Sequence, residues 1–437
     1  MINGREPAGG TVQKMWGYGR RSGSPVKGAK MSNLPDLQRL IQAHRRGGSL
    51  AQAFYQDPAV FEAEVVQFLE AHWIIAGHVA EIPERGDYLL FNALNASVIV
   101  VRGADGEINA FHNVCRHRGA KICEEPAGRT ALFRCRYHGW SYRLDGELAA
   151  WRHMPEELDK RDYALRRCGV AVFDGLILVS LKPQAAPDPQ VMLHHVREYW
   201  ARFDLGQCRV AATQVYRIAA NWKLAIENNL ECYHCLPSHL EYTSVNAFVR
   251  ADEKISEGVV EAFAAYQIEW RARMTAANTL TGRSEFIATE GQGCRAGTWP
   301  LAPGHLTGSR DGKAVAPLLG KIAAYDESVT TGCFGFLSYM AAMCDYAIVA
   351  TYVPQSVGVT DVVMRWLVRG DAVEGTDYDL KRLRWLWDET TQQDKSIIEL
   401  NAAGVASRGY MPGPYSRLES LTADFVDRYL ALMAAGA

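Results

Sequence analysis

The sequence lacks three features that would each assign it to a large class of proteins: long apolar runs, an excess of one charge, and dense cysteine. Its apolar stretches, such as Gly175–Leu181, are as long as a strand, whereas a membrane helix needs about 18 such residues. The formal net charge of −2 gives no electrostatic footprint for nucleic acid or an anionic membrane. Ten cysteines in 437 residues are too few for a disulfide scaffold. We therefore expect neither a nucleic-acid partner nor a membrane.

The composition is that of a soluble globular protein, with 48% hydrophobic and 22% charged residues. Several cysteines lie beside histidines, which favours metal binding in a reducing compartment and hence a cytoplasmic location. Residues 1–30 are rich in Gly, Lys and Arg, with Glu6 as the only acid, and no apolar segment of a secretion signal follows them. We expect a disordered tail, or an upstream start codon with Met31 as the usual start, and a transit peptide is the alternative.

A chain of this length exceeds one ordinary core, and its patterns predict two domains after a short helical segment. Residues 31–72 show apolar residues at helical spacing, and we expect them to pack on the catalytic domain. Residues 73–182 contain short apolar runs separated by turn pairs such as Asp105-Gly106 and Asp145-Gly146, which predicts antiparallel hairpins. The proline-rich stretch 182–189 is typical of a linker.

Helix and strand alternate through the second predicted domain, residues 190–437. Cys333–Pro354 and Asp361–Arg369 have the pattern of strands, and Tyr378–Ala403 that of a long amphipathic helix. The predicted fold class is therefore α+β: an antiparallel β domain, followed by a catalytic domain with an antiparallel sheet surrounded by helices.

The first metal-binding pattern lies in the β domain, where Cys115-Arg-His117 is followed after 17 residues by Cys135-Arg-Tyr-His138. Two thiolates and two imidazoles in this order predict a Rieske [2Fe–2S] cluster, in which histidine replaces cysteine on one iron. The alternative is a structural Cys2His2 zinc site, but the alternating spacing is unusual for zinc. We expect Trp140 and Tyr142 to pack around the cluster.

The second pattern lies in the catalytic domain and contains His234 and His239. We expect Glu231 and His234 to share one face of a helix that ends near Pro237, which would let His239 turn back. Asn228, in the same segment, is a further candidate catalytic residue. Two histidines and one carboxylate on one face of an iron leave positions open for substrate and O2. A polar histidine pair or a zinc site is the alternative. Cys232 and Cys235 are interpreted as small packing residues.

The third ligand must come from a distant part of the chain. On the predicted helix, Asp394 falls on the apolar stripe that includes Trp387, Thr391 and Ile398. A carboxylate on such a stripe is costly unless it is paired or binds a metal. Asp388 and Glu389 lie off the stripe and are interpreted as solvated. Asp394 is therefore the predicted carboxylate ligand.

The segments Phe111–Ala120 and Cys135–Tyr142 closely resemble the Rieske domain of the ring-hydroxylating oxygenase family, and the resemblance runs from about residue 55 to the C-terminus. It implies a [2Fe–2S] cluster and one mononuclear Fe(II) on a late carboxylate at the position of Asp394. It also implies a homotrimer in which Glu231, where most members have Asp, connects His138 of one subunit to His234 of the next.

The chain has no convincing nucleotide-binding motif of its own, since Gly291–Gly297 departs from the glycine pattern. The resemblance therefore implies that NAD(P)H acts through a separate reductase or ferredoxin. The segments 371–378 and 409–416 resemble the branch that demethylates glycine betaine and related quaternary amines. The competing hypothesis is an aromatic-ring hydroxylating mono- or dioxygenase. A Rieske electron carrier without catalysis is disfavoured, because it would need no second iron.

Aromatic side chains are candidates for binding a cationic substrate through their ring faces. The candidates are Phe334, Phe336, Tyr339, Tyr346 and Trp366. The alternative for each is ordinary packing in the core of a strand.

Overall fold

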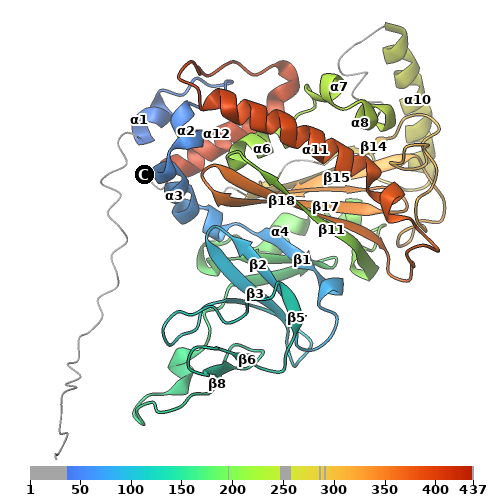
Figure 1. The fold of residues 1–437 in the computed structure, drawn as a ribbon. Coiled ribbons are helices and arrows are strands. Elements are labelled where there is room, and N and C mark those ends of the chain that lie inside the picture. The colour runs from blue at the N-terminus through green and yellow to red at the C-terminus, as the bar shows by residue number, and fades with distance from the viewer. Residues whose placement is uncertain (1–36, 195, 247–256, 285–286, 290–291, 436–437) are drawn as a thin grey trace, which may run out of the picture. The chain divides into compact units, whose positions relative to one another are not determined.

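A large antiparallel sheet lies between a smaller β region and a layer of helices (Figure 1). The structure is a computed structural model that describes residues 37–194, 196–246, 257–284, 287–289 and 292–435. From Leu37 onward the chain forms one unit. The tail predicted for residues 1–30 lies outside the described residues. The α+β fold class predicted from the sequence is confirmed.

The smaller β region contains three antiparallel sheets. Their strands are β1 (Ile74–His78), β2 (Asp87–Ala93), β3 (Ala96–Arg102), β4 (Ile108–His112), β5 (Ala127–Arg129), β6 (Phe133–Arg134), β7 (Ser141–Tyr142), β8 (Leu148–Ala150), β9 (Gly169–Phe173) and β10 (Leu176–Ser180). Gly106 and Gly146 both adopt positive φ angles of 87°, which lets the predicted turn pairs reverse the chain. The hairpins predicted from these pairs are confirmed: β3 pairs with β4, and β7 with β8.

The large sheet has eight strands in the order β11-β18-β17-β16-β15-β14-β12, with β13 beside β14. These strands are β11 (Cys208–Ile218), β12 (Gly282–Arg283), β13 (Ile287–Thr289), β14 (Gln292–Pro300), β15 (Ser328–Phe334), β16 (Ser338–Ala342), β17 (Ala347–Ser356) and β18 (Val359–Arg369). The strand structure predicted for Cys333–Pro354 is present. Turns divide that segment among β15, β16 and β17, while β18 includes the predicted Asp361–Arg369.

Helices precede, interrupt and follow the sheet. Their bounds are α1 (Leu37–Gln42), α2 (Gln52–Gln56), α3 (Pro58–Gln67), α4 (Pro189–His194), α5 (Arg197–Trp200), α6 (Trp222–Asn229), α7 (Cys235–Ser238), α8 (Leu240–Val245), α10 (Glu257–Ala276), α11 (Leu380–Val405) and α12 (Ser420–Ala435). The long helix predicted for Tyr378–Ala403 corresponds to α11, which begins after an Asp379 side chain that accepts from the Arg382 N–H. Among the described helices, none has both the length and the apolar character needed to cross a membrane.

Buried charges connect the N-terminal helices to the catalytic domain. Glu64 of α3 pairs with Lys223 of α6, and both side chains are fully buried. Trp222 and Tyr429 also donate to the Glu64 carboxylate, at 2.8 and 2.6 Å. Because one carboxylate receives hydrogen bonds from α6 and α12, it fixes three helices of different parts of the chain against each other.

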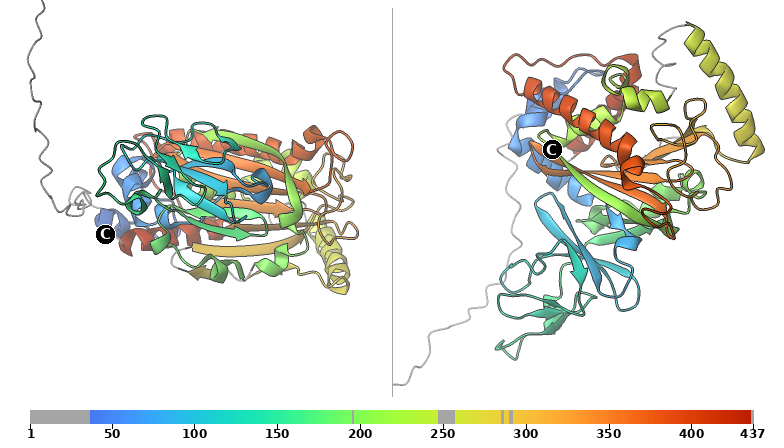
Figure 2. Two further views of the ribbon diagram at one scale, coloured as in Figure 1. Left: turned by 90° about the horizontal axis from the view of Figure 1, so that it is seen from below. Right: turned by 45° about the vertical axis from the view of Figure 1, so that its right-hand side comes forward.

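Polar contacts also join the smaller β region to the large sheet. Arg365 of β18 pairs with Glu81 at 2.9 Å and donates to the Ala76 carbonyl at 2.8 Å. The Thr351 hydroxyl donates to the Ile75 carbonyl at 3.1 Å. The β6–β8 sheet lies on the side of this region that faces away from the large sheet, whereas α6, α7 and α11 lie beyond the opposite face of the large sheet (Figures 1 and 2).

Candidate functional site

The predicted cluster residues lie on two loops with the same backbone turn. Cys115 accepts a hydrogen bond from the Gly119 N–H, and Cys135 accepts one from the Gly139 N–H, each at 3.0 Å through its carbonyl. Both glycines have positive φ angles, of 78° and 76°, which other residues rarely adopt. The two loops therefore present their cysteines and histidines to one another in equivalent ways.

The side chains of the four residues meet between the loops. The two cysteines are buried, at 3% and 2% exposure, while His117 and His138 reach the surface with their Nδ1 atoms 3.1 Å apart. Burial, together with the neighbouring Cys115, raises the pKa of the Cys135 thiol. Two buried sulfurs and two converging imidazole nitrogens form a donor set of the composition that a Rieske cluster requires.

Aromatic residues close the sides of this donor set. Trp140 stacks on His117 with ring centroids 4.8 Å apart and planes inclined by 7°. The Tyr142 oxygen lies 3.3 Å from the Cys115 sulfur and accepts from the Arg116 N–H at 3.0 Å. Trp140 and Tyr142 therefore lie where the sequence analysis expected them, against the proposed ligands.

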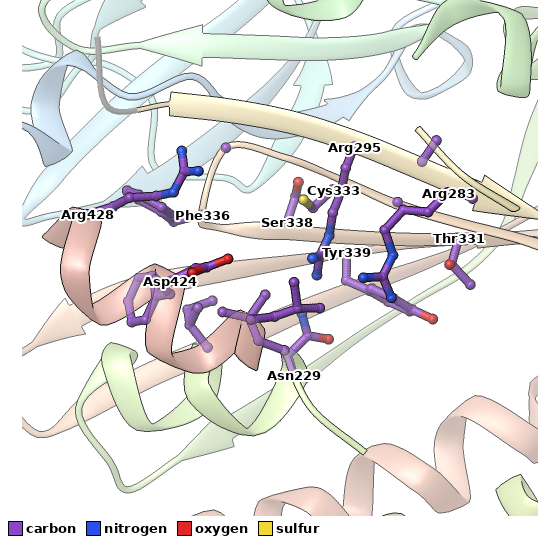
Figure 3. Close-up of a pocket in the computed structure, with 18 of the residues that line it drawn as sticks. Asn229, Arg283, Arg295, Thr331, Cys333, Phe336, Ser338, Tyr339, Asp424 and Arg428 are labelled. Atoms are coloured by element: carbon purple, nitrogen blue, oxygen red, sulfur yellow. The ribbon is translucent and has the colours of Figure 1, made fainter. Parts of the chain in front are cut away.

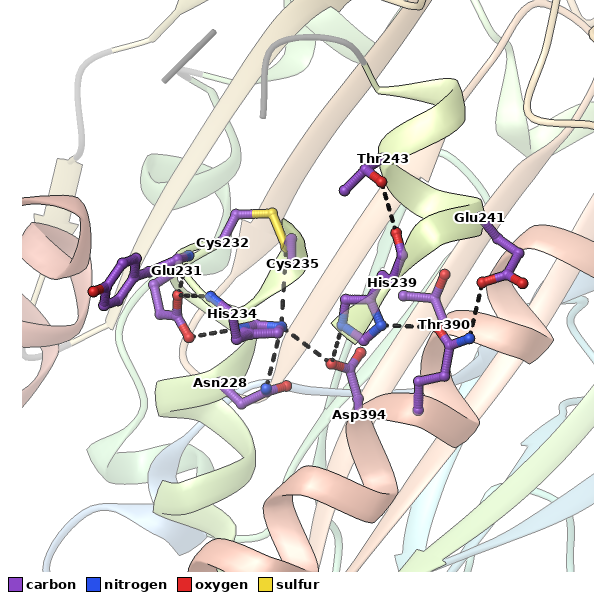
Figure 4. Close-up of polar contacts among 12 residues, drawn as sticks. Asn228, Glu231, Cys232, His234, Cys235, His239, Glu241, Thr243, Thr390 and Asp394 are labelled. Carbon is purple, nitrogen blue, oxygen red and sulfur yellow. Dashed lines mark hydrogen bonds and ion pairs between the residues drawn. A yellow bond between two sulfur atoms is a disulfide. The ribbon is translucent and has the colours of Figure 1, made fainter. Parts of the chain in front are cut away.

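His234, His239 and Asp394 converge in the second site (Figure 4). The Asp394 Oδ1 atom lies 3.3 Å from His234 Nε2 and 3.0 Å from His239 Nε2. Their opposite ring nitrogens are engaged elsewhere: His234 Nδ1 contacts Glu231 Oε1 at 2.5 Å, and His239 Nδ1 contacts Gln393 Oε1 at 2.9 Å. Since a carboxylate or amide oxygen only accepts, each Nδ1 donates its hydrogen outward, and each Nε2 faces the Asp394 carboxylate, where a metal ion can take the place of a proton.

The charge of this site also suits a cation. Burial alone lowers the pKa of His234, but Asp394 and Glu231 outweigh it and raise that pKa to about 9. The sulfur of Cys235 also lies near the two histidines. However, Cys235 forms a disulfide with Cys232, so the Asp394 carboxylate is the better third donor for iron. The interpretation of these two cysteines as mere packing residues is therefore wrong.

The local structure around Glu231 differs from the prediction. Helix α6 ends at Asn229, so Glu231 and His234 do not share a helix, and Pro237 lies inside α7 instead of ending a helix. Glu231 accepts hydrogen bonds from the N–H groups of Tyr233 and His234, as well as from the His234 ring. The Glu231 carboxylate thus stabilises the turn that follows α6. This turn, rather than a helix face, orients His234.

Two further residues complete the surroundings of the proposed ligands. The Asn228 amide lies 3.4 Å from His234 Nε2, at the edge of the site. Gln393, which the sequence analysis did not single out, connects His239 to Glu241 through its amide, at 2.9 Å on each side. Its position next to Asp394 is the only sequence signal that would have indicated it.

Asp388 is not the solvated residue that the helical pattern predicted. The Tyr216 hydroxyl donates to it, and Arg384 pairs with it at 3.4 Å, so its side chain is 30% exposed. Glu389 is exposed, as predicted. At Asp388, the part of α11 that lies off the apolar stripe contacts β11. The helical spacing of apolar residues alone could not predict this contact.

Comparison with known proteins places both sites in one family. The Rieske [2Fe-2S] domain family matches residues 72–173, and the ring hydroxylating alpha subunit (catalytic domain) family matches residues 205–321 and 331–435. The glycine betaine monooxygenase oxygenase subunit of Pseudomonas aeruginosa strain UCBPP-PA14 is 36% identical over 424 residues, which cover 93% of each chain. The chain is a Rieske non-haem iron oxygenase. It therefore carries a [2Fe–2S] cluster and a mononuclear iron, and both donor sets fit these groups.

Other relatives have different reactions in their names. The carnitine monooxygenase oxygenase subunit of Escherichia coli K12 is 30% identical over 216 residues, which cover 48% of this chain and 58% of that protein. The solved structure of the quaternary ammonium Rieske monooxygenase CntA with L-carnitine has a TM-score of 0.64 and 19% identity, covering 90% of this chain and 97% of that chain. The naphthalene 1,2-dioxygenase of Rhodococcus sp. reaches a TM-score of 0.62 at 21% identity, covering 93% and 99%. These structures share the fold.

A cavity of about 540 Å³, which we call the iron cavity, opens beside His234, His239 and Asp394 in the oxygenase. Aromatic rings form much of its wall: Tyr242, Phe263, Trp299, Tyr339, Tyr352 and Trp387. The Trp387 ring contacts the rings of Tyr242 and Tyr339 at centroid distances of 6.1 and 5.8 Å. A bound molecule would therefore meet ring faces within reach of the proposed iron ligands.

Only some of the predicted substrate residues line a described cavity. Tyr339 lines the iron cavity, and Phe336 lines a smaller one beside it. Phe334, Tyr346 and Trp366 instead belong to the core: Phe334 packs on Phe173, the Tyr346 hydroxyl donates to the Gly308 carbonyl, and Trp366 is covered by Arg384. Aromatic residues suit either face of a strand, so their presence alone did not identify the face.

The other rings of the wall were missed, although two had a sequence signal. Tyr242 lies one helical turn after His239, and Trp387 lies two turns before Asp394 on the same stripe of α11. Both positions follow from the proposed ligands and helical spacing. Tyr352 comes from β17, far away in sequence, and only the folded sheet brings it to the cavity.

Proposed function

We propose that this oxygenase removes a methyl group from the nitrogen of a small quaternary amine, using O2 and two electrons from a separate NAD(P)H-dependent reductase. The aromatic wall of the iron cavity carries this proposal. A quaternary ammonium has no N–H to donate, so ring faces such as those of Tyr242, Tyr339 and Trp387 are suited to bind it. The relatives named as glycine betaine monooxygenase subunits give independent support.

The proposed metal ligands are Cys115, His117, Cys135 and His138 for the cluster, and His234, His239 and Asp394 for the iron. When bound, the cluster stores the electron and the iron activates O2. Glu231 and Gln393 act as positioning residues, because each holds a ligating imidazole by its Nδ1–H and leaves Nε2 for the metal. Asn228 borders the same point and would restrict where a substrate methyl group can lie.

The proposed reaction balances without a further reactant. One oxygen atom of O2 enters a C–H bond of the N-methyl group, and the other leaves as water with two electrons and two protons. The resulting hemiaminal then breaks its C–N bond. The electron pair stays on nitrogen, the hydroxyl proton leaves, and formaldehyde and a tertiary amine are released.

Electron transfer is proposed to cross a subunit boundary in a homotrimer, from His138 of one subunit through Glu231 of the next. The β6–β8 sheet beside the cluster loops and the helices α7 and α11 beside the proposed iron ligands lie beyond opposite sides of the large sheet (Figures 1 and 2). Tyr137 beside the cluster is 57% exposed, and Tyr233 and Leu240 beside the iron ligands are 52% and 73% exposed. Exposed apolar side chains at both sites suit a contact between subunits. A catalytically active monomer in light scattering would contradict the trimer.

A substrate panel with a surrogate reductase tests the proposed reaction. Glycine betaine, carnitine and choline are compared with benzoate and naphthalene, scoring formaldehyde against ring-hydroxylated product. We expect stoichiometric formaldehyde from at least one quaternary amine. Ring hydroxylation without formaldehyde would instead establish an arene oxygenase.

A further inference from the structure

A smaller cavity of about 150 Å³ adjoins the iron cavity and carries an excess of positive charge (Figure 3). We call it the arginine cavity, because Arg283, Arg295 and Arg428 line it, and Asp424 is the only acid among the lining residues that the structure describes. These four side chains give a formal charge of +2. The two cavities lie side by side, since Arg283, Trp299, Thr331 and Tyr339 line both of them.

Strand geometry directs Arg295 into this space. Cys294 and Ala296 of β14 belong to the apolar core cluster on one face of the sheet. Because side chains alternate along a strand, Arg295 and Trp299 point to the opposite face, where Arg295 lies opposite Cys333 of β15. Arg295 therefore lies on the cavity side because of the register in which β14 pairs with β15.

The Arg295 guanidinium is half-buried and, among the described residues, has no hydrogen bond or ion pair. Partial burial of a cation costs hydration free energy, and a counter-ion is needed to compensate for this cost. The observation therefore points to an anionic ligand, and a guanidinium fits a carboxylate through two parallel hydrogen bonds. Arg283, which lies over the Trp299 ring at 5.8 Å, faces the same space from β12.

Tyr339 connects the two cavities. Its ring contacts Trp387 in the iron cavity, and Tyr339 also lines the arginine cavity together with Arg295. Figure 3 shows the guanidinium groups of Arg283 and Arg295 reaching toward this tyrosine. A molecule whose cationic end lies on the Tyr339 ring would thus have its other end beside two arginines.

We propose that Arg295, assisted by Arg283, binds the carboxylate of a zwitterionic substrate and so makes this oxygenase select N-methylated ammonium carboxylates over simple cations. This inference rests on the proposed function and adds the part of the substrate that lies away from the reacting methyl group. Choline, which has the same trimethylammonium group and no carboxylate, meets the positive charge of Arg295 where glycine betaine finds a hydrogen-bond partner. Selection therefore comes from repulsion as well as attraction.

Binding to the oxidised holoenzyme without O2, measured by calorimetry, tests the inference independently of turnover. Arg295→Gln should weaken glycine betaine binding by roughly 10- to 100-fold, the value of a charge-assisted hydrogen bond. Choline binding should be unchanged or stronger. Arg295→Lys should recover part of the glycine betaine affinity. Arg382→Gln is the matched control, since Arg382 pairs with Asp311 on the surface.

The outcomes separate this inference from the proposed function. Unchanged glycine betaine affinity in Arg295→Gln, or an equal loss for choline, would overturn the carboxylate site while formaldehyde release by the wild type still stands. No formaldehyde from the wild type with any N-methylated substrate would overturn the proposed function itself. Equal wild-type affinity for choline and glycine betaine would also overturn the proposed selection.

Discussion

The proposed cluster ligands and the proposed iron ligands are brought together by different means. His117 and His138 are 21 positions apart, on two loops with the same glycine-dependent turn. His239 and Asp394 are 155 positions apart, and they meet because the segment between α7 and α8 packs against α11. The first site therefore depends on local backbone geometry, and the second on the packing of the whole catalytic domain.

The ion pairs around the two sites differ in the same way. In the Rieske domain, Arg143 and Glu147 pair at 57% and 62% exposure, where such a pair contributes little to stability. In the catalytic domain, Lys223 and Glu64 are fully buried, and removing one partner would leave the other charge without compensation. The buried pair thus stabilises α6, the helix that precedes the segment of the proposed iron ligands, whereas the exposed pair contributes little to the hairpin that it joins.

Removing one ligand from each site gives the largest expected effects. His117→Ala should abolish the cluster EPR signal and acid-labile sulfide. His234→Ala should keep both and lower turnover by more than about 100-fold, because an iron ligand matters more than its outer partners. His153→Asn is the control, since His153 is exposed and its positive φ of 53° suits asparagine. Loss of the cluster in His234→Ala would show that the two sites are not separate.

The two acids of α11 test the assignment of the distant ligand. Asp394→Ala should lose the mononuclear iron, measured by metal analysis against sulfide content, and turnover with it. Asp388→Ala should keep the iron but lower the free energy of unfolding by about 1–3 kcal/mol, because the Tyr216 hydroxyl and Arg384 lose their partner. Equal iron content in Asp394→Ala and wild type would show that Asp394 is not the carboxylate ligand of the iron.

These differences explain which features the sequence could predict. The cluster motif, the turn glycines and the stripe of α11 are patterns within short segments, and their geometry follows from local rules. The turn at Glu231 was mispredicted because helical spacing continues through Asn229, while the carboxylate captures the next N–H groups and ends the helix.

Contacts between distant segments were the main source of error. Phe334, at the end of β15, and Tyr346, in the connection between β16 and β17, were assigned to the substrate although both are buried in the core. The Arg295 site needed the register of β14 against β15, which is a tertiary property. Asp388 looked solvated because nothing in α11 itself indicates that β11 lies against it.

The connection between the two sites is tested by Glu231→Gln. The amide would leave both metals bound but could not hold the two imidazoles as a carboxylate does, so we expect cluster oxidation to slow by roughly 10- to 100-fold. Rapid mixing of reduced protein with O2 and substrate measures this rate. Glu241→Gln serves as the control, since Glu241 contacts the site only through Gln393. Cluster oxidation at the wild-type rate in Glu231→Gln would show that Glu231 does not connect the two metal sites.

The last prediction concerns stability and leaves the ligands of both sites intact. Glu227 of α6 is buried, and burial raises its pKa to about 7, although Tyr55 and Tyr415 donate hydrogen bonds to it at 2.8 and 3.2 Å. Since its pKa in the folded state lies above the ordinary value of 4.5, the folded protein binds this proton more tightly than the unfolded chain. Stability should therefore fall as the pH rises from about 4.5 through 7.

Glu227→Gln should remove this dependence, because the amide does not titrate. The variant should match the wild type near pH 5 and exceed it at pH 8 by about 1–3 kcal/mol, less than the full value of the shift because the amide replaces the carboxylate hydrogen bonds imperfectly. Urea unfolding followed by tryptophan fluorescence measures the catalytic domain, and cluster absorbance reports on the Rieske domain. Glu147→Gln, on an exposed hairpin, should change neither signal. A Glu227→Gln protein less stable than wild type at pH 8 would show that the carboxylate is stabilised in its charged form, and that the buried network favours the ionised state.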